Sequence, residues 1–153
     1  MLFRRFGEDY HERKLEEETS FPVVAGVGGS SADLVRVLLA QHRRGREITD
    51  YILGTTRSGR IGSKAGTLAR ALDAMALMYE EHSAREDTVL FPTWKHALSG
   101  KQYEEISDRF EAIEREMFGG DGFEDAVKQI AAVEETLGVA DLAQFTAPRP
   151  PRG

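Results

Sequence analysis

Histidine and glutamate, two residue types that bind metal ions, stand together near the end of a segment with helical periodicity, Lys64 to about Val89. His82 and Glu86 are four residues apart. Side chains at that spacing lie on one face of a helix, about 6 Å apart, so both can reach a single ion. The inward stripe of this segment comprises Leu68, Leu72, Met75, Tyr79, His82, Glu86 and Val89. Because a carboxylate on such a stripe is costly without a cation, the pair indicates a metal site. There are two alternatives. Glu86 could form an ion pair at the surface, and His82 could be an ordinary histidine of the core.

A second pair of the same kind, His11 and Glu16, lies near the start of the chain. Both pairs are followed by Phe-Pro, and Glu16 and Glu86 each stand five residues before the phenylalanine. This internal repeat favours a shared ligand set. The copies differ, because a spacing of five would point Glu16 about 140° away from His11 on an ideal helix. A π-bulge would absorb the extra residue. The alternative is a solvated acidic run over residues 16–18, with His11 standing alone.

A third histidine that could join the site is His42, in the segment from about Ser30 to Thr55. It lies on an apolar stripe, and Gly45 follows on the same face. A glycine at that place lets another helix or a ligand come close. The alternative is a polar patch on a surface helix. His96 lies beyond the second Phe-Pro pair and outside the inward stripe, so we expect it at the surface.

Composition narrows the classes of function and partner. The chain has 153 residues, enough for one domain, and a formal net charge of −6, so neither nucleic acid nor a membrane is expected as a partner. The absence of cysteine excludes disulfides, zinc–thiolate sites and iron–sulfur clusters, so metal ligands must be nitrogen and oxygen. No apolar run approaches the ~18 residues of a membrane span or the pattern of a signal peptide. The expected location is the cytoplasm.

The expected secondary structure is entirely helical. Phe21-Pro22 and Phe91-Pro92 are expected to end helices, because proline disfavours a helical backbone in the residue before it. A short piece follows the second of these pairs and ends at Ser99-Gly100. The candidate N-caps of the second and third helices are Ser30, Ser31 and Ser63. The expected helices cover residues 2–19, 30–55, 64–89, 101–117 and 123–137.

These helices predict an all-α fold, an antiparallel up-down helical bundle. Residues 1–146 are expected to form one metal-binding domain, and residues 147–153, rich in proline and arginine, are expected to form a disordered tail.

Three stretches carry a resemblance to a known family. HSAREDTVLFP from His82, DYHERKLEEETSFP from Asp9 and LLAQHRRGREITDYI from Leu38 resemble metal-bearing helices of the hemerythrin-like HHE cation-binding domains. The resemblance runs from about Arg5 to Phe145 and includes a C-terminal extension like that of one bacterial subgroup. It implies an antiparallel four-helix bundle with two non-haem irons, bridged by two carboxylates and an oxo or hydroxo group. The ligands that it implies are His11, Glu16, His42, His82 and Glu86.

The sequence departs from this family at its start. Family members begin with a further helix that supplies another histidine, whereas this chain begins at Met1, just upstream of the first His/Glu pair. The bundle is therefore expected to be incomplete at the N-terminus, with one face uncovered. A neighbouring chain could supply the missing helix, or the helices after Lys101 could cover that face. The third alternative is a truncated copy of the domain with a damaged metal site. We expect a homo-oligomer, because large apolar patches are rarely left bare.

The function expected from this site is reversible binding or sensing of a small diatomic ligand, dioxygen or nitric oxide, or the handling of iron. No separate acid–base pair, nucleophile or phosphate loop indicates a conventional enzyme. A ferritin-like di-iron oxidase or peroxidase is one alternative, although such bundles carry Glu-x-x-His pairs and here histidine precedes glutamate. A haem bundle using His42 and His82 would leave the repeated carboxylates unexplained. The alternative from another class of function is that the chain is a metal-free helical interaction module, derived from a truncated domain of this family.

Overall fold

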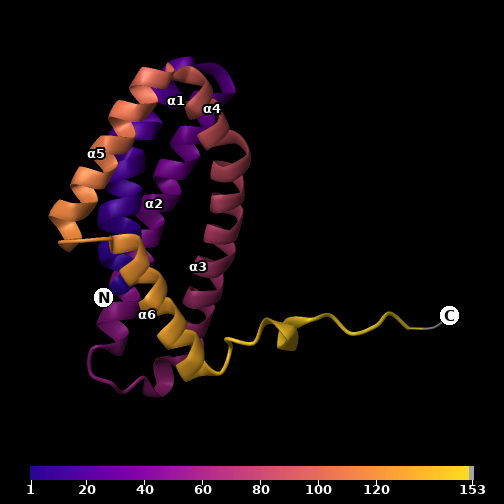
Figure 1. Ribbon diagram of the computed structural model, residues 1–153. Coiled ribbons are helices and arrows are strands. Elements are labelled where there is room, and N and C mark those ends of the chain that lie inside the picture. Colours follow the sequence, from indigo (N-terminus) through magenta and orange to yellow (C-terminus); the bar gives the residue numbers. More distant parts are fainter. Residues whose placement is uncertain (152–153) are drawn as a thin grey trace.

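The chain is all-α: the computed structural model describes residues 1–151, and no β-strand occurs within that range. Helices follow one another with few connecting residues (Figure 1). The elements are the π-helix η1 (Phe3–Ser20), α1 (Phe21–Val27), α2 (Gly29–Thr56), the 3₁₀-helix η2 (Gly62–Lys64), α3 (Ala65–Arg85), the π-helical turn η3 (Glu86–Leu90), α4 (Phe91–Ala97), α5 (Gly100–Phe118), α6 (Gly122–Leu137) and the 3₁₀-helix η4 (Leu142–Phe145).

Three long helical stretches lie lengthwise beside one another. One is η1 continued by α1, the second is α2, and the third is α3 continued by η3 and α4 (Figure 1). Both α5 and α6 contact η1. The apolar core lies at the end where α1, α2 and η3 meet, and it comprises Phe21, Val24, Val35, Leu38 and Leu90. This core holds the three stretches together beside the histidines.

Neither Phe-Pro pair ends a helix, so that prediction was wrong. The chain passes directly from η1 into α1 and from η3 into α4, with Pro22 and Pro92 in the first turn of each new α-helix. Proline fits there because the first turn needs no N–H from it. The turn before each proline is π-wound, with Phe21 N–H donating to Glu16 O and Phe91 N–H to Glu86 O. The internal repeat of the sequence is thus also a repeat of backbone structure.

The predicted helix starts are partly wrong. α2 follows Gly28, whose φ is 84°, and α3 follows Lys64; neither start has a side-chain cap, so the serines proposed for these positions do not cap. Ser99 instead forms a capping box with Gln102 at the start of α5. The helices near 101–117 and 123–137 are confirmed within one residue at each end.

The region after α6 contains the short helix η4 and otherwise no regular structure through residue 151. Residues 152–153, part of the predicted disordered tail, lie outside the described residues. Within the described part of the chain, no helix combines the length and apolar character needed to cross a membrane.

Candidate metal centre

The backbone of η1 brings the first His/Glu pair together. π-Winding pairs each backbone N–H with the carbonyl five positions earlier, as in the bond from Phe21 N–H to Glu16 O. Residues five apart therefore share a face, and His11 Nε2 lies 3.0 Å from Glu16 Oε1. The predicted single π-bulge is instead a π-helix over the whole of Phe3–Ser20.

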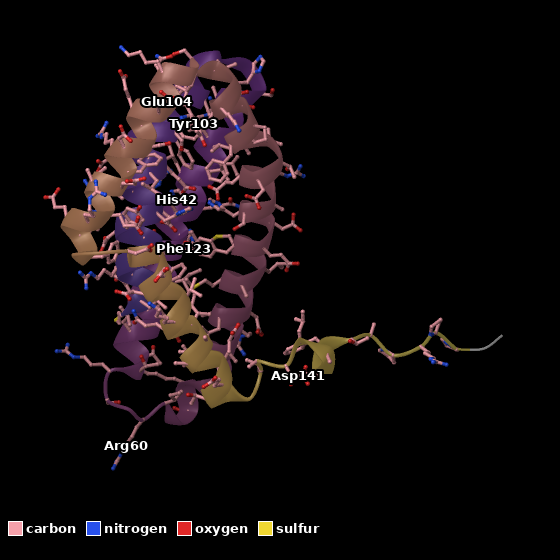
Figure 2. The ribbon with its side chains drawn as sticks, in the orientation of Figure 1. His42, Arg60, Tyr103, Glu104, Phe123 and Asp141 are labelled. Carbon is pink, nitrogen blue, oxygen red and sulfur yellow. The ribbon has the colours of Figure 1, made fainter. Side chains whose placement is uncertain are left out.

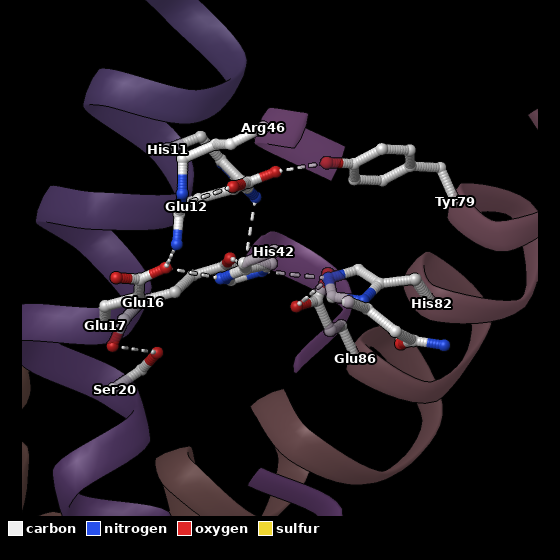
Figure 3. Close-up of polar contacts among 11 residues, drawn as sticks. His11, Glu12, Glu16, Glu17, Ser20, His42, Arg46, Tyr79, His82 and Glu86 are labelled. Atoms are coloured by element: carbon white, nitrogen blue, oxygen red, sulfur yellow. Dashed lines mark hydrogen bonds and ion pairs between the residues drawn. The ribbon is translucent and has the colours of Figure 1, made fainter. Parts of the chain in front are cut away.

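The second pair meets through ordinary α-helical spacing. His82 Nε2 lies 2.9 Å from Glu86 Oε1, and both side chains are buried. His42, on α2, approaches from between the two pairs: its Nε2 is 3.1 Å from His82 Nε2 and 3.3 Å from Glu16 Oε2. Figure 2 shows His42 at mid-height between the helices, and Figure 3 shows the side chains from η1, α2 and α3 converging.

Four of the five predicted ligands form one cluster. Each offers a nitrogen or oxygen atom, these atoms all lie within 4.8 Å of one another, and all four residues are buried. The cluster comprises Glu16, His42, His82 and Glu86. The fifth, His11, has a side chain that is 44% exposed and contacts the oxygen of Glu16 opposite to the one facing His42. The carboxylate of Glu16 therefore stands between two imidazoles.

Hydrogen bonds set the direction of both inner imidazoles. His42 Nδ1 lies 2.9 Å from Glu17 Oε1, and His82 Nδ1 lies 2.9 Å from Gln41 Oε1. An ionised carboxylate and an amide oxygen only accept hydrogen bonds, so each Nδ1 carries the proton. In the neutral rings, both Nε2 atoms then present lone pairs to each other across 3.1 Å. Such a contact is stable only with a cation between the rings, either a proton or a metal ion.

The buried carboxylates lack the hydrogen bonds that would otherwise compensate their burial. Among the described residues, none donates a properly oriented hydrogen bond to either oxygen of Glu16 or to Glu86 Oε1. Burial, with Glu16 nearby, raises the pKa of the Glu86 carboxyl. Burial also acts on Glu16, but the adjacent His11 and His42 outweigh it and lower its pKa to about 2. Two imidazoles and two carboxylates at these distances are a nitrogen–oxygen donor set that suits iron and other first-row metals.

A second polar network, which the sequence did not lead us to expect, braces the site. Tyr79 donates to Glu12 Oε1 at 2.6 Å, while Arg46 donates to Glu12 Oε2 at 3.0 Å and to Glu17 Oε1 at 2.8 Å. Burial and the Glu12 carboxylate raise the pKa of the Tyr79 hydroxyl. Arg46 thereby links Glu12 to the carboxylate that orients His42. Glu12 stands four residues before Glu16, but that spacing occurs on many solvated helices and does not single Glu12 out.

Gly45 is required by this network. A Cβ atom at this position would lie 2.0 Å from the hydroxyl oxygen of Tyr79. The prediction that a glycine one turn after His42 permits close approach of another helix is therefore confirmed, and the approaching group is a side chain of α3. His96 is exposed on α4, as predicted.

A small cavity of about 110 Å³ adjoins the cluster. It lies between η1 and α3, and residues of both His/Glu pairs line it. The lining residues of the candidate site are His11, Glu12, Glu16, Tyr79, His82 and Glu86. The volume suits a molecule of a few atoms beside the carboxylates.

Comparison with known proteins identifies relatives without a described function. The chain is 40% identical over 147 residues to the uncharacterized proteins Rv1995 of Mycobacterium tuberculosis and Mb2018 of Mycobacterium bovis. The alignment covers 95% of this chain but 57% of each relative, so the chain spans little more than half their length. No family model matches the chain, and no solved structure matches it.

Proposed function

We propose that this chain is a hemerythrin-like protein that holds two non-haem iron ions and reversibly binds or senses a small neutral ligand such as dioxygen or nitric oxide. The observation that carries the proposal is the pair of facing Nε2 atoms of His42 and His82, flanked by buried carboxylates without hydrogen-bond donors. A proton between the rings would supply one positive charge, whereas two carboxylates, Glu16 and Glu86, are buried beside them. Metal ions satisfy both sets of atoms at once.

The donors divide into two groups around the carboxylates. His42 and His82 would hold one ion together with Glu16 and Glu86. His11, on the opposite oxygen of Glu16, would hold the second. This second position has fewer protein donors than the first and belongs to the lining of the small cavity. Iron with an incomplete set of protein ligands supplies reversible binding of small molecules, so the cavity is where we place the ligand.

The finer arrangement of the fold is part of the same proposal. Gly28 alone separates α1 from α2, and five residues, 57–61, separate α2 from η2. Connections this short place consecutive helices beside one another in opposite directions. We infer an antiparallel up-down bundle in which η1 with α1, α2, and α3 with η3 and α4 supply the ligand-bearing helices.

Replacement of the proposed ligands tests the function. His82→Ala and Glu86→Ala should each lower the iron retained by protein purified without chelators, because each removes one donor atom from the cluster. His96→Ala is the matched control, since His96 is exposed on α4. Helical circular dichroism should be measured in each variant to confirm folding. Equal iron retention in all three variants would contradict the ligand assignment.

A further inference from the structure

An apolar groove runs between η1 and α6, on the side of η1 that carries His11. Its volume is about 550 Å³, within the range of binding pockets for small organic molecules. The polar side chains along it are His11 and Glu134. The apolar walls are formed by Leu2, Phe3, Phe6, Ala126, Ile130 and Val133.

The groove shares a wall with the cavity of the candidate metal centre. Phe3, Gly7 and His11 line both spaces. Gly7 contributes no side chain, so the Phe3 ring and the His11 imidazole are the side chains of this common wall. The Phe3 ring packs edge-on against Tyr79, with ring centroids 5.3 Å apart. A Cβ atom at Gly7 would lie 3.3 Å from the Phe3 ring, so even a small side chain there would crowd the wall.

We propose that this groove is the entrance through which a small neutral ligand reaches the metal cavity, and that Phe3, Gly7 and His11 form the passage. The inference rests on the proposed metal centre for its end point. Apolar walls favour a weakly hydrated molecule such as dioxygen or nitric oxide, whereas an anion would lose its hydration there. An anion would also meet the carboxylates of Glu134 at the groove and of Glu16 in the cavity.

The first experiment needs no metal. Dissolved dioxygen is paramagnetic, so in the metal-free full chain it should broaden methyl resonances in the groove more than methyls that face only water. Val133 in the groove and Val37 on α2 form a matched pair, since both are 54% exposed. Stronger broadening of Val133 supports the entrance, and equal broadening overturns it. If the extra broadening of Val133 over Val37 disappears as the protein concentration rises, a second copy of the chain covers the groove. That result also overturns the proposed entrance.

The second experiment uses the iron-loaded chain and measures the association rate of nitric oxide by stopped flow. Gly7→Val should slow association severalfold, because the added side chain crowds Phe3. Gly54→Val is the control, since Gly54 is an exposed helical glycine with open space around its Cβ position. Phe3→Ala should speed association, whereas Phe145→Ala, which removes an exposed ring that lines neither space, should not.

Iron content separates the two possible failures. A wild-type chain that binds no iron contradicts the metal centre, and the dioxygen broadening of Val133 against Val37 then decides whether the groove admits a small neutral molecule. Variants with normal iron content and unchanged nitric oxide association contradict the entrance and leave the metal centre standing.

Discussion

Orientation of two imidazoles is what distinguishes this site from a polar patch. Gln41 and Glu17 are not expected to touch the ions, yet they accept the Nδ1 protons of His82 and His42 and so direct both Nε2 atoms inward. Outer partners of this kind hold metal-binding histidines in the correct tautomer and raise their basicity.

Removal of the Gln41 acceptor should weaken metal binding without removing a ligand. We predict that Gln41→Leu lowers iron affinity by about 10–100-fold, the usual effect of losing such a partner, as measured by competition with a chelator. Gln41→Glu should restore much of the affinity, because a carboxylate also accepts the Nδ1 proton. Gln129→Leu, at an exposed position on α6, is the control. Unchanged affinity in Gln41→Leu would show that the ring orientation has another origin.

Gly45 and Tyr79 should be coupled in stability. Gly45→Ala places a methyl group 2.0 Å from the Tyr79 hydroxyl oxygen and should cost roughly 1–3 kcal/mol, the usual range for overpacking. Gly54→Ala should instead stabilise the chain by up to about 1 kcal/mol, because alanine is the better helix former. Urea unfolding measures both. Tyr79→Phe should recover part of the Gly45→Ala loss, since it removes the clashing oxygen; fully additive effects would contradict the packing described.

The sequence predicted the candidate ligands better than the residues that support them. The repeated His/Glu pairs before Phe-Pro predicted His11, Glu16, His82 and Glu86, and the apolar stripe that ends at Gly45 predicted His42. The fold brings all of these except His11 into one buried cluster. Gln41 and the network around Arg46 were not identified, because a polar residue in a charged segment does not reveal which way its side chain turns. That direction depends on the contacts between helices, which no local pattern contains.

At the scale of the elements, proline does not interrupt the helices that carry the proposed ligands. Each Phe-Pro pair follows π-wound backbone, in which the phenylalanine N–H donates to the carbonyl of a proposed ligand, Glu16 or Glu86. In this wider turn the phenylalanine N–H bonds to the carbonyl five residues earlier instead of four. The next α-helix begins at that phenylalanine, without a break in the helical chain. Phe21 and Phe91 keep helical dihedral angles although proline disfavours them in the preceding residue. Each proline then stands in the first turn of the next α-helix, where its missing N–H is not needed.

The same helix, η1, buries a carboxylate that is not part of the metal cluster. The side chain of Glu8 is fully buried, with Arg4 Nη1 2.9 Å away. Burial raises the pKa of Glu8, and this effect exceeds the opposing influence of Thr49 and Arg4. A raised pKa means that the folded chain holds this proton more tightly than the unfolded chain. The contribution to stability is therefore full below the unfolded pKa and is lost as pH rises through the folded value.

Glu8→Gln should consequently be more stable than the wild type at pH 7, and this advantage should shrink as the pH falls toward the unfolded pKa. Urea unfolding of the metal-free chain at several pH values measures both effects. Glu18→Gln, in an exposed ion pair with Lys14, should change stability little. A Glu8→Gln variant that is less stable at pH 7 would show that the ion pair with Arg4 outweighs the cost of burial.

At the scale of the whole molecule, α5 and α6 cover part of the face that was expected to be open at the N-terminal side of the bundle. They pack on η1 through aromatic contacts, with the Phe6 ring 5.8 Å from Phe118 and 6.4 Å from Phe123 between centroids. α6 keeps an outer apolar stripe, however, in which Phe123, Val127 and Leu137 are exposed. The homo-oligomer expected from the sequence stays a prediction, and this stripe is the surface that it would use.

Association through the outer stripe can be tested directly. Sedimentation equilibrium should show a concentration-dependent mass, and Val127→Glu should shift the chain toward monomer by placing a charge among apolar residues. Val37→Glu, at a similarly exposed valine on α2, is the control. A wild type that remains monomeric across the accessible concentrations would contradict the prediction.

Imidazoles and carboxylates from η1, α2, α3 and η3 are proposed to hold metal inside the helices. The most direct test of this proposal is iron titration of the metal-free full chain, with bound iron and the temperature of unfolding measured on the same samples. We predict about two irons per chain and an unfolding temperature that rises as iron binds, because a ligand of the folded state stabilises it. Iron that fails to bind, or an unfolding temperature unchanged by saturating iron, would contradict the claim.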